Sequence, residues 1–529
     1  MGKRCGGNGW MSLTTLDQWI DWAARYECLP YIRKCSGARG VPASWEPFWQ
    51  KAAKPSFVLE SGKSGRYTYL GDTPLAAITG KGAQARIVRY DPDTAAVIEE
   101  RQVTGKPLPV VKAFMDGRRA PKVGGVPPFV GGCVGYWSYD VARSIERLPV
   151  LAVDDLQLPD YDFMIVRRVW AYDLQERELY CIVHQPAPGA AASVQELERL
   201  YREAEAETAR MAKRWDEAYA EAEADERTVS RLRAHETISR QDALAIDVEN
   251  IPGIELAFTK KDYIEAVRKI QHYIAQGDVF QVNLSVRQSR RLEQEPEQIY
   301  EWLRLLNPSP YMGLLRLPGY DIVSGSPELL VKCVDGVVET RPIAGTRPRG
   351  SSDEEDRRLA EELIGNEKER AEHVMLVDLL RNDLGRVSRY GTVKVTDLMV
   401  VETYSHVMHI VSHIEGRLAD HKDVYDVTAA TFPGGTITGA PKIRTMEIIE
   451  ELEPVRRGPY TGSIGWIDYC GDMELNIVIR TLVATGGIGY VQSGAGIVID
   501  SVPEKEFTES LNKAKALWKA VLHSENRGS

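Results

Sequence analysis

The stretch FPGGTITGAPKIRTMEIIEELEP (432–454) joins a glycine-rich loop to the expected start of a helix. Its glycines allow a ligand to approach the backbone closely, and Pro441 stands where the free N–H groups of a helix attract anions. Thr436 and Lys442 are therefore candidates for ligand contact, with purely structural loop and cap roles as the alternative. The motif GxxxxGK[ST] is absent, so the loop does not have the pattern of a nucleotide-binding P-loop.

Two pairs of glutamates outside this loop predict a metal site. They are Glu369 and Glu372 in NEKERAEHVMLVDL (366–379), and Glu506 and Glu509 in SVPEKEFTES (501–510). A spacing of three residues places both carboxylates of a pair on one face of a helix. Two such acidic faces, brought together, form an oxygen-only site that suits Mg²⁺ rather than zinc. Because Mg²⁺ usually binds through one or two carboxylates plus an anionic ligand, the pairs also predict an anionic substrate.

Composition narrows the class of protein. The chain has 529 residues, 43% of them hydrophobic, which is enough for several domains or one large α/β unit. Its net charge of −10 argues against general nucleic-acid binding, which needs a basic footprint, but allows an anionic small substrate. The seven cysteines are scattered without a CxxC motif, so we expect reduced thiols and a cytoplasmic location. We expect neither a secretory signal nor a membrane span, because no sustained apolar run is present.

Residues 1–250 are predicted to form a β-rich region with a helical insertion. Short strands bounded by turn residues are expected at 56–60, 65–71, 85–91 and 178–184. Residues 194–224 are rich in alanine, glutamate and arginine and predict a helix, whereas the polar stretch 225–253 has the texture of an inter-domain connection. This region would pack with the rest of the chain as one unit.

Residues 251–529 are predicted to form the catalytic region, in which helices and strands alternate. Thr259 is the expected N-cap of a first helix that ends near Gly277. Strands are expected at 279–287, 320–326, 329–341 and 476–484, and further helices at 354–364, 368–381, 440–452 and 505–520. This alternation alone favours parallel βαβ units.

Several single residues are candidates for the functional site because of the chemistry of their side chains. Arg480 lies within an apolar strand-like run, where a charge needs a partner such as a bound carboxylate or a structural salt bridge. Glu328 in GSPELL (325–330) would act as a general acid if burial raised its pKa. His409 lies in YSHVMHIVSH (404–413), whose alternating texture predicts a strand and a hydrogen-bonded histidine rather than a metal ligand.

Two glycine-containing segments complete the candidate set. PIAGTRPRG (342–350) places Gly345 and Thr346 at a strand-to-loop turn, next to arginines that either bind a carboxylate or are simply solvated. The segment QSGAGIVIDS (492–501) offers Gly494 and Gly496, which mark either an anion site or a bend in the backbone.

Taken together, these motifs resemble the chorismate-using enzymes, a family that includes anthranilate synthase component I, aminodeoxychorismate synthase component I, isochorismate synthase and salicylate synthase. The resemblance covers nearly the whole chain, from LESGKSGRYTYLG (59–71) to the helix expected at 505–520, with the motifs in the family's order. It implies an α+β fold, a large antiparallel-sheet sandwich flanked by helices, in place of the parallel units that the alternation favours.

The resemblance also implies roles for individual residues. Glu372 and Glu509 would bind Mg²⁺, supported by Glu369 and Glu506. Glu328 would be the general acid that helps a ring hydroxyl to leave. The remaining implied contacts are Gly345, Thr346, Gly496 and Lys513 to the ring carboxylate or the metal shell, Tyr460, Arg480 and Gly494 to the enolpyruvyl carboxylate, and His409 and Thr436 beside the ring.

Gln281 separates the branches of this family. Relatives that add water have a lysine there as the base, whereas an amide cannot activate water and resembles the branches that use ammonia. Isochorismate and salicylate synthases are therefore not expected. Four motifs resemble the aminodeoxychorismate branch, namely FPGGTITGAPK, DLLRNDLGR (378–386), YTGSIGW (460–466) and ELNIVIRTL (474–482). Ala344 points the other way, because many aminodeoxychorismate synthases have a lysine there that attacks C2, and anthranilate synthases have alanine.

The expected reaction is therefore Mg²⁺-dependent amination of chorismate at C4 for folate synthesis, with anthranilate synthase component I as the alternative. The resemblance implies a tryptophan pocket formed by Glu60, Ser61, Pro310, Tyr311 and Met312. Feedback inhibition there would favour the alternative, although the aminodeoxychorismate branch can hold tryptophan structurally or pack the pocket itself. The chain lacks a glutaminase nucleophile motif, so a separate glutaminase subunit would supply ammonia. A non-catalytic tryptophan-binding sensor is the remote alternative.

Overall fold

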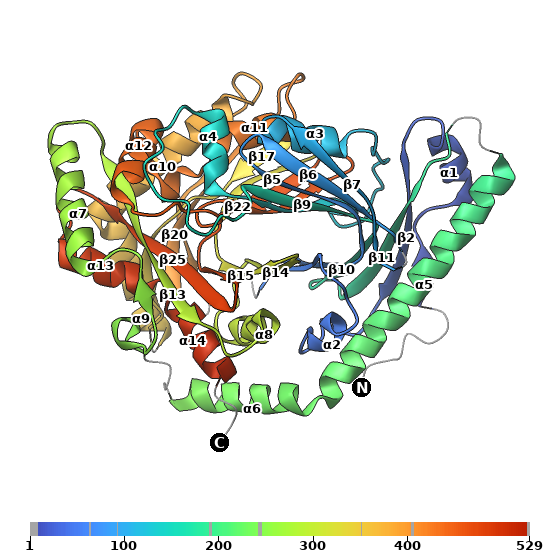
Figure 1. The fold of residues 1–529 in the computed structure, drawn as a ribbon, viewed down its shortest axis with the longest axis horizontal. Coiled ribbons are helices and arrows are strands. Elements are labelled where there is room, and N and C mark those ends of the chain that lie inside the picture. The colour runs from blue at the N-terminus through green and yellow to red at the C-terminus, as the bar shows by residue number, and fades with distance from the viewer. Residues whose placement is uncertain are drawn as a thin grey trace.

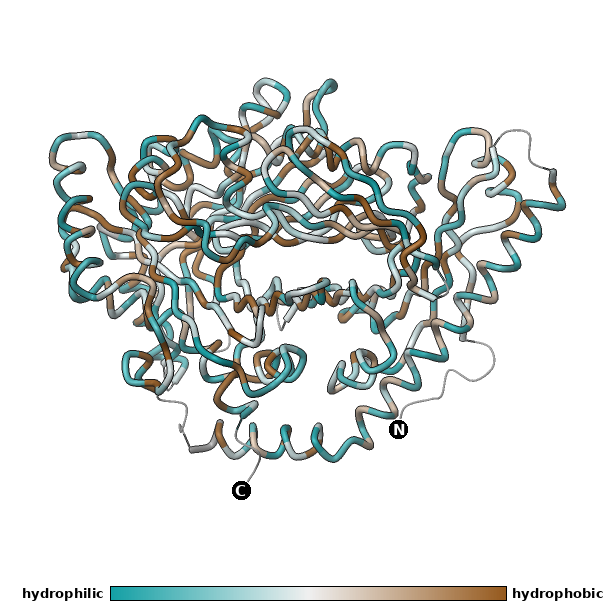
Figure 2. Tube along the Cα trace, viewed as in Figure 1, coloured by the Kyte–Doolittle hydropathy of each residue, from teal (hydrophilic) through white to brown (hydrophobic). Residues whose placement is uncertain are grey.

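The computed structural model describes residues 9–525, except 63–64, 93, 190–192, 242–245, 351 and 404–406. In this part of the chain, two large sheets pack face to face as a sandwich, with helices on the outside (Figure 1). Phe57 and Ile322 of the first sheet and Val134 and Ile464 of the second belong to the apolar core between the sheets. The long helix α5 (Val194–Ala224) at the edge of the molecule is mostly hydrophilic, as its outer position requires (Figure 2).

The first sheet has 13 strands within the described residues. Its order is β1 (Trp10–Ser12), β2 (Cys28–Ser36), β11 (Glu178–Pro186), β10 (Arg168–Asp173), β4 (Tyr67–Gly71), β3 (Ser56–Glu60), β14 (Tyr311–Leu317), β15 (Tyr320–Ser326), β24 (Thr481–Thr485), β25 (Ile488–Ile497), β13 (Gln281–Arg291) and β12 (Glu255–Leu256), and β21 (Gly439–Ala440) also pairs with β13. Strands β3 and β14 pair directly. This sheet therefore runs across the predicted boundary near residue 250.

The second sheet has 12 strands in the same part of the chain. Its order is β18 (Ile343–Pro348), β20 (Val407–Arg417), β17 (Val337–Thr340), β16 (Leu329–Val334), β23 (Met473–Asn476), β22 (Ser463–Asp468), β8 (Gly132–Trp137), β9 (Tyr161–Val166), β5 (Pro74–Lys81), β6 (Gln84–Tyr90) and β7 (Val97–Thr104), and β19 (Lys394–Thr403) also pairs with β20. The strand pairs of both sheets are antiparallel. The antiparallel sandwich is confirmed, and the parallel units that the alternation favours are wrong. Consecutive strands such as β14 and β15 are joined by short turns, which allow only antiparallel pairing.

Helices cover the outer faces of both sheets. Against the first sheet lie α5, α7 (Lys260–Ala275), α8 (Pro296–Leu306), α13 (Pro503–Asn512) and α14 (Lys515–Glu525); against the second lie α3 (Pro107–Met115), α10 (Glu367–Gly385) and α11 (Val424–Thr431); and α12 (Lys442–Leu452) contributes to both cores. The other described helices are α1 (Leu16–Trp22), α2 (Glu46–Trp49), α4 (Ala142–Ile145), α6 (Glu226–Gln241) and α9 (Asp353–Gly365). Thr259 caps α7 by accepting a hydrogen bond from Asp262 N. Among the described residues, we find no helix with the length and apolar character that crossing a membrane requires.

Part of the stretch 225–253, which the sequence predicts to be an inter-domain connection, forms the helix α6. The Asp225 side chain caps this helix by accepting a hydrogen bond from the N–H of Thr228 at 2.8 Å. Arg231 is buried and forms an ion pair with Glu46. Polar residues therefore fasten α6 to its neighbours instead of leaving it in solvent, which composition alone does not reveal.

Three predicted elements are interrupted. The strand expected at 329–341 is the hairpin of β16 and β17, and the helix expected at 505–520 is divided into α13 and α14. The strand expected at 476–484 is also wrong, because the chain leaves β23 of the second sheet and enters β24 of the first. Arg480 lies in this crossing with a φ of 49°. The apolar run thus marks a buried crossing between the sheets, not one continuous strand.

Candidate active site

The candidate site begins at Gln281, the first residue of β13. Its amide Nε2 donates a hydrogen bond to Glu372 Oε1 of α10 at 2.8 Å. The Gln281 side chain is 7% exposed, and its other polar atom, Oε1, has no hydrogen-bond partner among the described residues. A predicted metal-binding carboxylate is therefore held beside the residue that separates the family's branches.

Strand β25 lies next to β13 and contributes two glycines. Asn283 pairs in register with Gly496, and Ser285 pairs with Gly494. A Cβ atom at Gly496 would overlap Gln281 Nε2, and one at Gly494 would lie 2.8 Å from Asn283 Oδ1. The lack of side chains at both positions is what allows the two amides to lie over β25.

Glu509 reaches the same strand through Lys513, which follows it on the C-terminal turn of α13. Lys513 Nζ donates a hydrogen bond to Gly494 O at 2.9 Å and lies 3.1 Å from Glu509 Oε1. The Lys513 and Glu509 side chains are 46% and 56% exposed, so their ion pair is weak and open to a ligand. Glu372 and Glu509 thus approach β13 and β25 from two different helices.

Gly345 and Thr346 lie in β18, where the pairing with β20 shifts its register, so the predicted strand-to-loop turn is in fact a bulge. Gly345 has a φ of 63°, and a Cβ atom there would lie 2.9 Å from Glu369 Oε2. His409 Nδ1 is 3.0 Å from the Gly345 carbonyl oxygen and 2.9 Å from the Thr346 hydroxyl. Burial lowers the pKa of His409, so the ring is neutral at physiological pH and fastens the bulge to β20.

Glu328 lies immediately before β16 and is 7% exposed. Burial raises the pKa of its carboxyl to about 7, against the opposing effects of the Thr436 hydroxyl and of the positive charges of Arg480 and Lys513. A carboxyl with this pKa still holds a proton near neutral pH and can donate it. Four side chains from separate parts of the chain therefore interact around this carboxyl, namely Glu328, Thr436, Arg480 and Lys513.

Arg480 lies in the crossing between the sheets, and its positive charge acts on Glu328. Its carbonyl oxygen accepts a hydrogen bond from Gly325 N at 2.9 Å, which fixes the backbone there. Burial lowers the pKa of the guanidinium, which the charge of Glu328 partly offsets. No hydrogen bond to the guanidinium is present among the described residues. The side chain therefore remains able to bind a carboxylate.

Sequence reasoning missed Arg457, which lies buried beneath Tyr460. Its guanidinium donates hydrogen bonds to Glu453 at 2.7 and 2.9 Å, to the Ile437 carbonyl at 2.9 Å and to the Asn283 carbonyl at 2.7 Å. Its Cζ lies 5.5 Å from the centroid of the Tyr460 ring. Arg457 thus ties the glycine-rich loop, β13 and Tyr460 together. The only signal in the sequence is a pair of opposite charges four residues apart.

The two residues singled out in the glycine-rich loop have different surroundings. Lys442 Nζ forms a buried ion pair with Asp383 of α10 at 2.6 Å and donates to the Thr431 carbonyl at 3.3 Å. Lys442 therefore serves the scaffold. The Thr436 hydroxyl is buried close enough to the Glu328 carboxyl to lower its pKa, and it remains a candidate for ligand contact beside that acid.

The predicted metal residues supply oxygen atoms alone. In the part of the chain that the structure describes, no three acidic, histidine or cysteine side chains are grouped closely enough to hold a metal ion. One Glu372 oxygen accepts a hydrogen bond from Gln281, and one Glu369 oxygen forms an ion pair with Arg347 Nη1 at 3.4 Å. Two carboxylates completed by an anionic substrate are a donor set that fits Mg²⁺.

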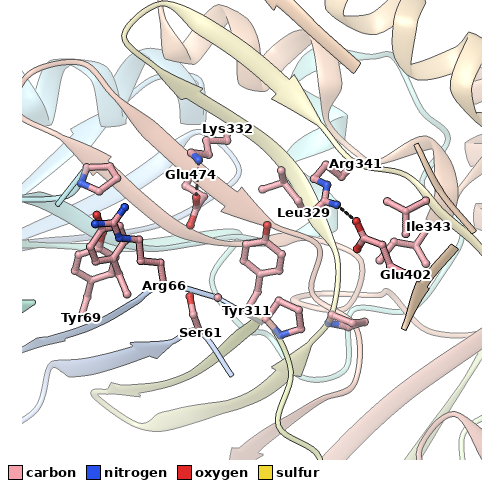
Figure 3. Close-up of a pocket in the computed structure, with 16 residues that line it drawn as sticks. Ser61, Arg66, Tyr69, Tyr311, Leu329, Lys332, Arg341, Ile343, Glu402 and Glu474 are labelled. Atoms are coloured by element: carbon pink, nitrogen blue, oxygen red, sulfur yellow. Dashed lines mark hydrogen bonds and ion pairs between the residues drawn. The ribbon is translucent and has the colours of Figure 1, made fainter. Parts of the chain in front are cut away.

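A cavity of about 600 Å³ lies between the sheets (Figure 3). Ser61, Pro310 and Tyr311 of the predicted tryptophan pocket line it. Lys332 and Glu474 also line it, from neighbouring strands of the second sheet, and their charged groups lie 3.9 Å apart. The cavity is therefore amphipathic, with aromatic walls and charges of both signs.

Glu60 and Met312 line a smaller adjoining space of about 40 Å³. The Glu60 carboxylate already accepts a hydrogen bond from the Tyr300 hydroxyl at 2.6 Å and pairs with Arg304 at 2.9 Å. Its charge is therefore balanced within the protein.

The chain matches the family of chorismate binding enzymes over residues 55–519 and belongs to this family. It is 47% identical to aminodeoxychorismate synthase component 1 of Bacillus subtilis (strain 168), over 90% of this chain and 93% of that protein. It is 45% identical to anthranilate synthase component 1 of Thermus thermophilus, over 89% and 93%. The crystal structure of anthranilate synthase component I from Streptococcus pneumoniae TIGR4 has a TM-score of 0.66 and 31% identity, and the match covers 87% of this chain and 93% of that one. The family resemblance seen in the motifs is confirmed.

Proposed function

We propose that this protein acts as component I of an aminodeoxychorismate synthase, which aminates chorismate with ammonia to 4-amino-4-deoxychorismate for folate synthesis. The observation that carries amination is the hydrogen bond from Gln281 to Glu372. An amide at this position cannot take a proton from water, whereas ammonia is already a nucleophile. The C4 product is supported by the 47% identity to the Bacillus subtilis protein and by the four branch-like motifs.

The site offers groups for both carboxylates of chorismate. Arg480 would bind the enolpyruvyl carboxylate, with Tyr460 and Gly494 beside it. The ring carboxylate would be contacted by Gly345, Thr346, Gly496 and Lys513. Glu372 and Glu509, supported by Glu369 and Glu506, would hold Mg²⁺, which would neutralise this carboxylate and polarise the leaving hydroxyl.

Glu328 would donate the proton that the leaving hydroxyl needs. Its raised pKa keeps the acid form available near neutral pH. His409 and Thr436 would flank the ring and fix its position relative to this acid. These groups lie on strands and at the ends of helices, which would hold them in position for the substrate.

Ala344 bears on which ring carbon of chorismate, C4 or C2, receives the amino group. It is buried in β18 and has no amine that could attack the ring. If C4 is aminated, ammonia would also have to serve as the nucleophile at C2. This alanine, together with the 45% identity to the Thermus protein, is what favours the alternative function of anthranilate synthase component I.

A product assay tests the proposal. Purified protein would be incubated with chorismate, magnesium chloride and ammonium chloride, and the products separated and identified by mass. We expect 4-amino-4-deoxychorismate. Formation of anthranilate and pyruvate would reject the C4 amination and establish the protein as anthranilate synthase component I. Tight binding of tryptophan without any turnover of chorismate would support the non-catalytic tryptophan-binding sensor.

A separate glutaminase subunit is proposed as the source of ammonia in the cell. The relatives named above are components 1 of their synthases, which supports a second component. Burial raises the pKa of Cys28 to about 12 and that of Cys333 to about 11, so neither thiol is an activated nucleophile. Activity with glutamine only after addition of such a subunit would support this partner. The cytoplasmic location stays a prediction.

Tryptophan is proposed as a ligand of the cavity in Figure 3. Tyr311 and Pro310 would stack against an indole, and Leu329 and Ile343 line the same cavity on strands next to Glu328 and Gly345. A ligand there would therefore contact the strands that carry the active site. Calorimetric titration with tryptophan, followed by rate measurements, would separate a regulatory ligand from a structural one.

A further inference from the structure

We propose that the side-chain amide oxygens of Gln281 and Asn283 form the binding site for the ammonia that attacks chorismate. This assignment rests on the proposed amination and adds the atoms that hold its nucleophile. The ligand is a small neutral molecule with N–H donors and a lone pair.

The orientation of the Gln281 amide is set by Glu372. The amide atom 2.8 Å from Glu372 Oε1 is the donor Nε2, which bonds to this carboxylate oxygen. The carbonyl atom Oε1 therefore points elsewhere, is buried, and accepts no hydrogen bond from the described residues. Buried acceptors without a donor are uncommon in folded proteins, and this one indicates a ligand.

Asn283 supplies a second acceptor of the same kind. It lies two residues beyond Gln281 on β13, and alternate residues of a strand share a face. Its Oδ1 is also buried and has no donor among the described residues. The two nearby cations are engaged elsewhere, because Lys513 bonds to the Gly494 carbonyl and Arg457 to the backbone carbonyl of Asn283.

Ammonia fits two neighbouring amide oxygens. It has three N–H donors, so two can be bound while the lone pair remains free to attack the ring. An ammonium ion has no lone pair, and an amide cannot remove its extra proton, so the site would use neutral ammonia. Water can occupy the same acceptors, but it stays a poor nucleophile because no base stands at this position.

The step balances without any further reactant. In the first displacement, the nitrogen of one ammonia forms a bond to C2 while the bond from the ring to the hydroxyl breaks. For the C4 product, a second ammonia then forms a bond to C4 while the bond from C2 to the first nitrogen breaks and the first ammonia is released. The hydroxyl takes a proton from Glu328 and leaves as water. The new amino group carries one proton in excess, which the Glu328 carboxylate or solvent takes up.

Steady-state rates test the assignment, with ammonium chloride varied at fixed pH, saturating chorismate and Mg²⁺, and no glutaminase. Asn283→Ala removes one acceptor without touching Glu372. We expect its KM for ammonia to rise about 3- to 10-fold, the effect of one lost hydrogen bond. Its KM for chorismate and its Mg²⁺ requirement should stay as in the wild type.

Two further variants and a control complete the design. Gln281→Met removes the other acceptor together with the bond to Glu372, so both the KM for ammonia and the Mg²⁺ requirement should rise. Gly496→Ala pushes the Gln281 side chain aside and should behave similarly. Gln276→Met makes the same exchange at the exposed C-cap of α7 and should leave all constants unchanged.

The outcomes separate this inference from the function on which it rests. If folded Asn283→Ala and Gln281→Met keep the wild-type KM for ammonia, the ammonia site is overturned and amination stands. If the wild-type chain converts no chorismate with ammonia, the proposed function itself fails. Circular dichroism identifies any variant that does not fold, and the remaining variants then decide.

Discussion

Glu328 and Gln281 show how the surroundings of a residue change its chemistry. Burial raises the pKa of Glu328 to about 7, so this carboxyl can act as an acid near neutral pH. The bond to Glu372 fixes the Gln281 amide and leaves its oxygen without a donor. Motifs in the sequence predicted both residues as members of the site. They could not predict the raised pKa of Glu328 or the fixed orientation of the Gln281 amide, because each depends on residues from other parts of the chain.

Replacement of Glu328 by glutamine keeps the shape of the side chain and removes the acid. We expect Glu328→Gln to lower kcat at least about 100-fold, which is the usual contribution of a positioned general acid. The KM for chorismate should change little, because the substrate carboxylates are bound elsewhere. An unchanged kcat in steady-state assays would show that another group donates the proton.

The pH dependence of the wild type follows from the same pKa. The acid form of Glu328 is lost as the pH rises through about 7, so the rate should fall above that value. At constant free ammonia and saturating chorismate, we expect a decline of about tenfold per pH unit. Glu328→Gln should lack this decline, and a flat wild-type profile in the same range would contradict the assignment.

Glu509 tests the metal site with little risk to the fold. Its side chain is 56% exposed, so Glu509→Gln should change the free energy of unfolding by less than about 0.5 kcal/mol. Turnover should fall about 100-fold, because one charge that stabilises the leaving group is lost. Rates measured over a series of Mg²⁺ concentrations check this, with Glu504→Gln, an exposed change on the same helix, as the control.

At the scale of elements, buried ion pairs hold loops and helices around the site. Arg457 joins β13 to the glycine-rich loop, and Lys442 joins that loop to α10. Local patterns predicted α5, α7, α9, α10 and α12, because caps and periodicity lie within one segment. They did not predict the helix α6, and the strand that they predicted across Arg480 is wrong, since contacts with distant segments decide both.

Arg457→Met should destabilise the protein strongly. The Arg457 and Glu453 side chains are 1% and 3% exposed, and the change leaves the glutamate buried without its counter-ion. We expect a loss of about 3–5 kcal/mol in the free energy of unfolding, measured by urea denaturation. Arg444→Met, which removes exposed ion pairs with Glu447 and Asp278, should lose no more than about 1 kcal/mol. Equal losses in the two variants would contradict this reading of Arg457.

At the scale of the whole molecule, a buried polar network joins the two sheets. Tyr320 of β15 donates a hydrogen bond to Asp162 of β9 at 3.0 Å, and the Tyr136 hydroxyl of β8 lies 3.1 Å from that of Tyr320. Burial raises the pKa of Asp162 to about 7. The sandwich therefore has a titratable group at its centre.

The raised pKa means that the folded state binds this proton more tightly than the unfolded state. The stabilisation is complete below the unfolded pKa of 3.8 and is lost as the pH rises through about 7. Relative to Asp162→Asn, the wild type should lose up to about 3 kcal/mol between about pH 5 and 8. Urea denaturation of both proteins at the two pH values measures this difference, and a constant difference would place the proton elsewhere.

The sequence by itself determined the family, the antiparallel sandwich and the residue types of the candidate site, because motifs preserve residue type and order along the chain. It also determined local elements such as the helix at 194–224, whose cap and composition lie within the segment. Only the tertiary structure decided that Gln281 meets Glu372, that Arg457 lies beneath Tyr460, and that burial raises the pKa of Glu328. These features arise from contacts and burial between segments far apart in the chain, and such contacts leave no pattern in a single stretch of sequence.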